Sequence, residues 1–157
     1  RARLNASHEW QFMLHDVQRT LMVVMSHVAT PSSVRHLNPN MLPDDLSAQC
    51  ESWIDAMTLL MADGEGYFIL PGGTEISALC HQARVAARRA ERRLCTLNKL
   101  DALPAQIMSY INRLSDLFFT MARYDLHLAG ASEERWQAFG YKRKRREDVA
   151  ENRGEGN

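Results

Sequence analysis

Apolar residues recur at three- and four-residue steps through most of this 157-residue chain, and that spacing constrains the fold more than any other feature. Such steps place apolar side chains on one face of an α-helix. The pattern predicts four long helices, over residues 9–29, 43–62, 75–97 and 104–129. No segment longer than four residues reads as a convincing strand. We therefore expect an all-α protein that folds as an up-and-down helical bundle.

Proline, glycine and threonine mark the ends of these helices. Pro31 ends the first helix, because a proline lacks an amide donor and disfavours helix in the residue before it. Pro43, followed by two acidic residues, favours the start of the second helix. Thr74 is expected to cap the third helix. Gly130 is expected to stop the fourth helix.

The chain after the fourth helix divides into two parts. Ser132 begins a predicted short helix, which has acidic residues in its first turn and Trp136 and Phe139 on one side. The charged residues that follow show no apolar periodicity. We therefore expect one bundle domain over residues 1–141 and a charged C-terminal tail over residues 142–157, a size that suits one domain.

The balance of charge excludes several classes of protein. The 19 basic and 19 acidic residues give zero formal net charge, which argues against a nucleic-acid coat and against a disordered charged chain. Three cysteines without a CxxC pair favour packing residues in a reducing, cytoplasmic compartment. The uncharged stretch over residues 20–34 is shorter than the roughly 20 residues a membrane span needs, so no membrane association is expected.

The zero net charge hides a strong segregation. Residues 36–83 contain seven acidic residues and no Lys or Arg. The third helix that follows carries a local charge of +4 from five arginines less one glutamate, namely Arg84, Arg88, Arg89, Arg92, Arg93 and Glu91. Basic charge is therefore concentrated on one helix.

Arg84 and Arg88 lie one helical turn apart and admit two interpretations. In the first, the arginines form a solvated face that pairs with Glu91 and with the acidic second helix, where each exposed pair contributes about 0–1 kcal/mol. In the second, two planar guanidinium forks bind a polyphosphate. The neighbouring face of small alanines would then let another helix approach closely and form a groove. Periodicity alone does not decide between them.

Three motifs point to a family. They are F-I-L-P-G-G-T at residues 68–74, C-H-Q-A-R-V-A-A-R-R-A-E-R-R at residues 80–93, and Y-I-N-R-L-S-D-L-F-F-T-M-A-R at residues 110–123. Their order and spacing resemble the signature of the ATP:cob(I)alamin adenosyltransferases of the propanediol-utilisation (PduO) type. The resemblance covers most of residues 11–124.

The resemblance implies a homotrimer of five-helix bundles with active sites between subunits. It also implies transfer of the 5′-deoxyadenosyl group of ATP, with Mg²⁺, to the cobalt of reduced cobalamin and release of triphosphate. A cobalamin reductase or a cobalamin-dependent enzyme is an implied partner. No metal-ligand set is implied, and His81 is more typical of a satisfied interfacial histidine than of a metal ligand.

By the same resemblance, Arg84 and Arg88 match arginines near the nucleotide and the intersubunit contact. Glu91 matches the acidic residue of that motif, and Asn112 matches the nucleotide-binding asparagine. Phe68 matches the aromatic residue that pushes the lower ligand of the corrinoid away from cobalt. Each has an ordinary alternative: Phe68 is typical of a core aromatic, and Asn112 of a cap or an interhelical hydrogen bond.

Two departures from the family pattern matter. The family opens with a T-x-T-G-D-x-G loop and a helix containing D-E-L-N, and neither pattern occurs in these 157 residues. The first bundle helix and much of the ATP pocket are therefore expected to lie outside them, and the 157 residues alone are expected to bind ATP poorly. Cys80 also stands where the family has leucine.

Two other functions are alternatives to the enzyme. A non-catalytic corrinoid-binding or delivery bundle would bind cobalamin without releasing triphosphate. Nucleic-acid binding through residues 142–146 and 88–93 is disfavoured, because acidic residues follow the basic run and no aromatic residue interrupts it.

Overall fold

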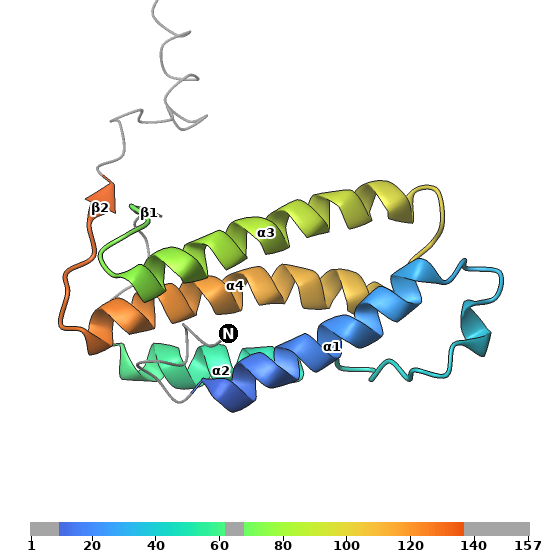
Figure 1. Cartoon of the computed structure of the whole chain (residues 1–157), viewed down its shortest axis with the longest axis horizontal. Helices are drawn as coiled ribbons and strands as arrows, with labels where there is room; N and C mark the ends of the chain where they lie inside the picture. The colour runs from blue at the N-terminus through green and yellow to red at the C-terminus, as the bar shows by residue number, and fades with distance from the viewer. Residues whose placement is uncertain (1–9, 62–67, 137–157) are drawn as a thin grey trace, which may run out of the picture.

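The computed structural model describes residues 10–61 and 68–136, and these form an up-and-down bundle of four α-helices (Figure 1). Consecutive helices run in opposite directions, which confirms the predicted up-and-down bundle. The strands among the described residues are only two residues long, which confirms the predicted all-α class. The helices are α1 (Gln11–Ala29), α2 (Ala48–Leu60), α3 (Glu75–Asn98) and α4 (Ala105–Leu128). The expected tail over residues 142–157, and Phe139 with it, lie outside the described residues.

Helix α4 lies at the centre of the bundle and packs against both α2 and α3. Its largest fully buried side chains are Ile107, Tyr110, Leu117 and Met121. Burying one such side chain stabilises the fold by about 1.5–3 kcal/mol relative to leaving it exposed. The position of α4 therefore determines where α2 and α3 lie, and α3 makes the more extensive contact with it.

The predicted helix ends are mostly correct. Thr74 caps α3, because its Oγ1 accepts a hydrogen bond from the Ser77 amide at 3.0 Å. Gly130 follows α4 with a φ of +62°. The predicted start of α2 at residue 43 is too early, because the helix begins at Ala48. The side chain of Asp45 accepts a hydrogen bond from the Ala48 amide at 3.0 Å. The acidic residues after Pro43 therefore lie in the turn before the helix and not in its first turn.

A buried arginine fastens α1 to the turn between α3 and α4. Arg35, in the short 3₁₀ helix η1 (Arg35–Leu37), is 9% exposed. Its Nε donates to the carbonyls of His27 at 3.0 Å and Thr30 at 3.1 Å. Its Nη1 donates to the carbonyl of Ala102, and its Nη2 pairs with Asp101 at 2.7 Å. The guanidinium thus joins the end of α1 to the turn between α3 and α4, which lies 66 and 67 residues away from Arg35 in sequence.

The predicted short helix from Ser132 is wrong. Residues Arg135–Trp136 instead form a strand, β2, which pairs antiparallel with β1 (Phe68–Ile69). The amide of Leu70 extends the ribbon by donating to the carbonyl of Glu134 at 2.8 Å. Backbone groups beside the bundle need partners, and the two segments supply them to each other. This tertiary pairing outweighs the local helix signal of the two glutamates.

The alanine face of α3 behaves differently from the expectation. Ala87 is buried, but Ala86 and Ala90 are exposed in this chain. Helix α3 meets α4 through a neighbouring stripe, which includes the fully buried Ser77 and Cys80. Cys80, the first residue of the second motif, therefore faces α4.

Within residues 10–61 and 68–136, no helix combines the length and the apolar character that crossing a bilayer requires.

Candidate functional site

The carboxylate of Glu91 joins two helices. Its Oε2 pairs with Nη1 of Arg88, one turn earlier on α3, at 2.7 Å. Its Oε1 accepts a hydrogen bond from Nδ2 of Asn112 on α4 at 2.8 Å. The Glu91 side chain is 16% exposed, whereas that of Arg88 is 48% exposed. Three predicted site residues therefore form one unit at the α3–α4 interface.

This unit is suited to an anionic ligand. One nitrogen of the Arg88 guanidinium is engaged by Glu91, and half of the side chain still faces solvent. Asn112 is also exposed, and Glu91 fixes the direction of its amide group. A guanidinium presents planar donors that match phosphate oxygens, and an amide adds a directional hydrogen-bonding group. Because the carboxylate is shared, a shift in one residue is transmitted to the other.

Arg84 lies one turn before Arg88 and is half-buried. Its Cζ lies 5.3 Å from the ring centroid of Phe119 on α4, within cation–π range. The ring of His81 meets the same Phe119 edge-on, with 6.2 Å between centroids. Arg84 is thus held against α4, and the fully solvated interpretation of this stripe is wrong for Arg84 and Glu91.

His81 is buried beside this cation. Its ring is 6% exposed, and neither ring nitrogen has a hydrogen-bond partner among the described residues. Burial lowers the pKa of the His81 imidazole, and the positive charge of Arg84 lowers it further. The part of the chain that the structure describes contains no group of three His, Cys, Asp or Glu side chains placed to hold a metal ion.

Phe68 lies on the ribbon beyond the start of α3, and its side chain is 76% exposed. The alternative that Phe68 is a core aromatic is therefore wrong for this chain. The loop after it sits tightly on α4: Gly73 has a φ of +88°, and a Cβ there would lie 2.5 Å from Cδ2 of Leu126. Gly72 also has a positive φ, of +148°, and Gly73 in addition allows a close approach to α4.

A hollow of about 400 Å³ lies between this loop and α3. Its lining is mostly apolar and includes Pro71 from the loop and Ala78, His81 and Val85 from α3. The hollow therefore lies between the loop that follows Phe68 and the part of α3 that precedes Arg88.

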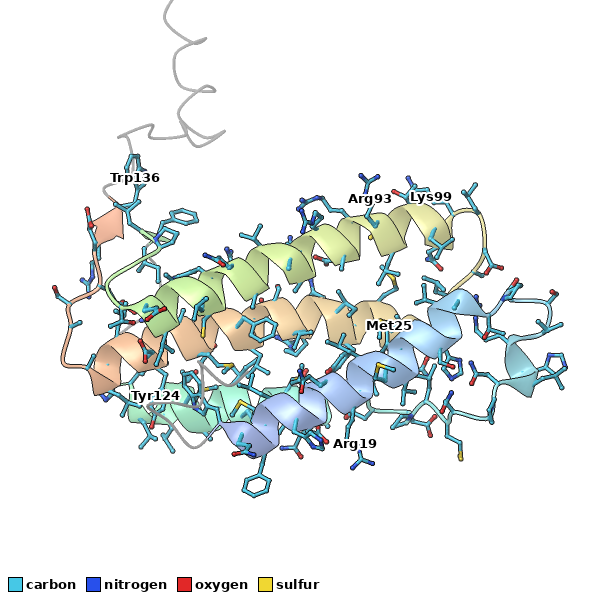
Figure 2. The ribbon with its side chains drawn as sticks, in the orientation of Figure 1. Arg19, Met25, Arg93, Lys99, Tyr124 and Trp136 are labelled. Atoms are coloured by element: carbon cyan, nitrogen blue, oxygen red, sulfur yellow. The ribbon has the colours of Figure 1, made fainter. Side chains whose placement is uncertain are left out.

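The interpretation that acidic residues of α2 pair with the arginines of α3 is not supported by the ion pairs of the described residues. Glu51 of α2 pairs with Arg113 of α4 at 3.1 Å, and Arg113 also pairs with Asp116 at 3.1 Å. Among the described residues, the ion pair between an α3 arginine and an acid is the local one with Glu91. Arg93 points away from α4 into solvent (Figure 2).

Two residues of the candidate site escaped the sequence-based predictions. Phe119 lies within the third motif, but nothing in that pattern indicates that its ring receives Arg84. The sequence predicts a helix at Trp136, but this residue lies on strand β2 (Figure 2), and the register of the two strands pairs it with Phe68. Pairing between two-residue strands leaves no periodic signal, which explains the second omission.

Comparison with known proteins is consistent with this geometry. The family model described as Cobalamin adenosyltransferase matches residues 1–125. The human corrinoid adenosyltransferase MMAB is 38% identical over 130 residues, which cover 81% of this chain and 52% of the human protein. The chain therefore spans about half the length of that relative.

Solved structures agree with the sequence comparison. A variant PduO-type ATP:corrinoid adenosyltransferase from Lactobacillus reuteri, complexed with cobalamin and ATP, superposes with a TM-score of 0.77 at 28% identity. That match covers 85% of this chain and 74% of the other. A second variant of the Lactobacillus enzyme, complexed with ATP, has a TM-score of 0.73 at 29% identity, covering 82% of this chain and 71% of the other.

Proposed function

This chain belongs to the cobalamin adenosyltransferase family, and on that premise we propose that it takes part in transfer of the 5′-deoxyadenosyl group of ATP to the cobalt of cob(I)alamin. The observation that carries the proposal is the unit in which Glu91 holds Arg88 and Asn112 across the α3–α4 interface. All three lie within motifs that resemble the family signature, and the unit presents donors to an anion.

The chemistry requires little of the protein beyond placement. The cobalt of cob(I)alamin is the nucleophile: its electron pair forms the bond to the 5′-carbon of ATP. The bond from that carbon to the phosphate oxygen breaks, and its electrons leave with triphosphate. The protein must align the two substrates and stabilise the developing charge on the leaving group. No nucleophilic side chain is needed for this step.

The geometry supports the following proposed roles. Arg88 binds the triphosphate through the guanidinium donors that Glu91 does not engage, and Asn112 binds the nucleotide beside it. Arg84 adds positive charge one turn away while its contact with Phe119 keeps it against α4. Phe68 faces the lower side of the corrinoid, where an exposed phenyl ring offers no atom that could coordinate cobalt.

Mg²⁺ is proposed to accompany ATP. In nucleotide sites it is usually bound by phosphate oxygens, waters and one or two carboxylates rather than by a cage of protein ligands. Glu91 is the carboxylate of the Arg88–Glu91–Asn112 unit, and it is already engaged by two donors. In the proposed complex Mg²⁺ would be held mainly by the triphosphate and by water, and it would share with the arginines the role of balancing charge on the leaving group.

We further propose a homotrimer with sites between subunits and a reductase, or a cobalamin-dependent enzyme, as partner. Exposed apolar residues support the assembly: Phe12 and Met22 on α1 are 87% and 64% exposed, and Ala86 and Ala90 of α3 are uncovered. Three free cysteines, one of them exposed, support a reducing compartment such as the cytoplasm.

The test uses the full-length protein with ATP, Mg²⁺ and chemically reduced cobalamin, followed by the absorbance of adenosylcobalamin and by triphosphate release. Arg88→Ala should lower kcat/KM by about 100-fold, the loss typical of removing one charge-stabilising donor. Arg93→Ala, on the solvent side of the same helix, should leave kcat/KM unchanged. Cobalamin binding without triphosphate release would instead indicate a corrinoid-binding or delivery protein.

A further inference from the structure

Strand β2 places Trp136 directly opposite Phe68. The register pairs Phe68 with Trp136 and Ile69 with Arg135 in an antiparallel ribbon. Directly opposite residues extend from the same face of such a pair, with Cβ atoms about 4.5–5.5 Å apart. Phe68 is 76% exposed and Trp136 is 44% exposed, so two large aromatic side chains share one accessible face. The ribbon lies at the end of the bundle where α3 begins and α4 ends (Figure 1).

Both strands of the ribbon are fastened to the C-terminal end of α4. After β1, the hydroxyl of Thr74 donates to the carboxylate of Asp125, a residue only 3% exposed. Before β2, Glu133 pairs with Nε of Arg123 at 2.6 Å, and both side chains are nearly buried. The same helix therefore holds the chain just after β1 and just before β2, so the two aromatic residues have a defined position relative to each other.

An exposed phenyl ring is poorly suited to pressing on a ligand by itself. With three quarters of its surface in solvent, the Phe68 side chain has few neighbours to select one rotamer. A facing indole restricts that freedom, and aromatic pairs of this kind contribute about 0.5–1.5 kcal/mol beyond the area they bury. An indole also has a donor N–H and no acceptor lone pair, so it cannot replace a displaced cobalt ligand.

We propose that Trp136 is a positioning residue, which holds the Phe68 ring against the lower face of the corrinoid so that the lower ligand stays off the cobalt. The inference rests on the proposed function. It assigns Trp136 a role that is needed only while a lower ligand competes for cobalt. In cob(I)alamin the cobalt has already lost that ligand, whereas cob(II)alamin retains it until the ligand is displaced.

The difference between the two oxidation states supplies the test. In one assay a strong chemical reductant delivers cob(I)alamin to the full-length protein with ATP and Mg²⁺. In the other, cob(II)alamin is supplied with reduced flavin as a weaker one-electron donor, so the ligand must leave on the protein before reduction. Trp136→Ala should lower the second rate about fivefold to tenfold, in line with the free energy of an aromatic pair, and leave the first nearly unchanged.

A spectroscopic readout makes the test independent of turnover. The paramagnetic resonance spectrum of cob(II)alamin with ATP shows coupling to the lower-ligand nitrogen, which disappears when the ligand leaves. Trp136→Ala should reduce the fraction of ligand-free cobalt on the protein, and Trp136→Phe should restore most of it. Leu100→Ala removes an exposed apolar side chain from the turn between α3 and α4, at the opposite end of the bundle from the ribbon, and serves as the control, with no effect expected on either readout.

Several outcomes would overturn the inference. Equal losses in both assays would indicate a general structural role, and no loss in either would indicate no role. Because Trp136 acts through Phe68, the double variant Phe68→Ala/Trp136→Ala should be no worse than Phe68→Ala alone, and additive losses would contradict the proposal. If Trp136→Ala lowers Tm, Trp136→Leu keeps apolar bulk without the flat ring and must still show the selective loss. A wild-type protein inactive even with cob(I)alamin would refute the proposed function itself.

Discussion

Asn112 donates a hydrogen bond to Glu91 across the interface of α3 and α4, with 2.8 Å between Nδ2 and Oε1. The second oxygen of the same carboxylate holds Arg88 at 2.7 Å. An acid at the centre of an anion site would ordinarily repel the ligand. Here its charge is matched by Arg88, and its geometric effect is to fix the direction of the two groups that are proposed to bind the ligand.

Glu91→Ala is expected to weaken ATP binding even though it removes a negative charge. Arg88 and Asn112 would lose their shared acceptor, so the KM for ATP should rise about tenfold, equivalent to about 1.4 kcal/mol. Steady-state kinetics with varied ATP measure the effect. Glu51→Ala removes an acid that also pairs with an α4 arginine but outside this unit, and it should change KM by less than about twofold. A lower KM in Glu91→Ala would show that repulsion dominates.

Gly73→Ala should destabilise the protein more than Gly130→Ala does. Both glycines have positive φ, but only at Gly73 would the new Cβ meet a side chain, 2.5 Å from Leu126. Strain in the left-handed region costs about 1–2 kcal/mol at either site, and the clash adds to it at Gly73. Urea unfolding of the two variants measures the difference, and equal losses would contradict the close approach.

The sequence was informative wherever a local rule applies. Helical periodicity predicted α1, α3 and α4 to within two residues, and the Thr74 cap follows from the preference of its hydroxyl for a helix N-terminus. The motif residues Arg88, Glu91 and Asn112 were also predicted as neighbours in function, and the structure brings them together. Pairing of an arginine with Glu91 and an interhelical hydrogen bond of Asn112 were both among the alternatives, and both occur. That Glu91 is the acceptor in both was not predictable, because it depends on the rotation of α3 against α4.

Tertiary pairing explains the errors. Ser132 and the two glutamates after it form a sound helix start by local rules, yet Glu133 is engaged by Arg123 and the next residues pair with β1. The exposure of Phe68 follows from the same pairing, since the ribbon holds it outside the bundle. Neither the sequence around Phe68 nor the sequence around Trp136 contains a pattern that predicts pairing with a segment more than sixty residues away.

His81 should make the fold sensitive to mild acid. Burial, together with Arg84, lowers the pKa of His81 in the folded protein below its ordinary value of 6.5. The unfolded chain then binds a proton more readily than the folded one, so stability is full above pH 6.5 and falls as the pH drops below it, by at most about 1.4 kcal/mol per pH unit. Urea unfolding at pH 7.5 and 5.5 should show a smaller loss in His81→Leu than in the wild type. An identical loss would mean that His81 titrates normally.

Arg35→Met should destabilise the protein by about 2–4 kcal/mol without altering the candidate site. The variant removes the donor shared by the carbonyls of His27 and Thr30 and leaves Asp101 without its cation. Thermal and urea unfolding measure the loss. Arg19→Met, at an exposed position on α1, should change stability by less than about 0.5 kcal/mol. If the two variants unfold alike, the clasp does not stabilise the bundle.

The ribbon also has a consequence for the order of events during synthesis. Its strands flank α3 and α4, so β1 emerges from the ribosome well before the residues that pair with it. The antiparallel α3–α4 hairpin must form first, because it brings the two ends of the segment side by side and shortens the loop that remains to be closed. Phe68 therefore acquires its neighbour only after α4 has folded, and a nascent chain that ends with α4 has the helices α1 to α4 but not yet the aromatic pair.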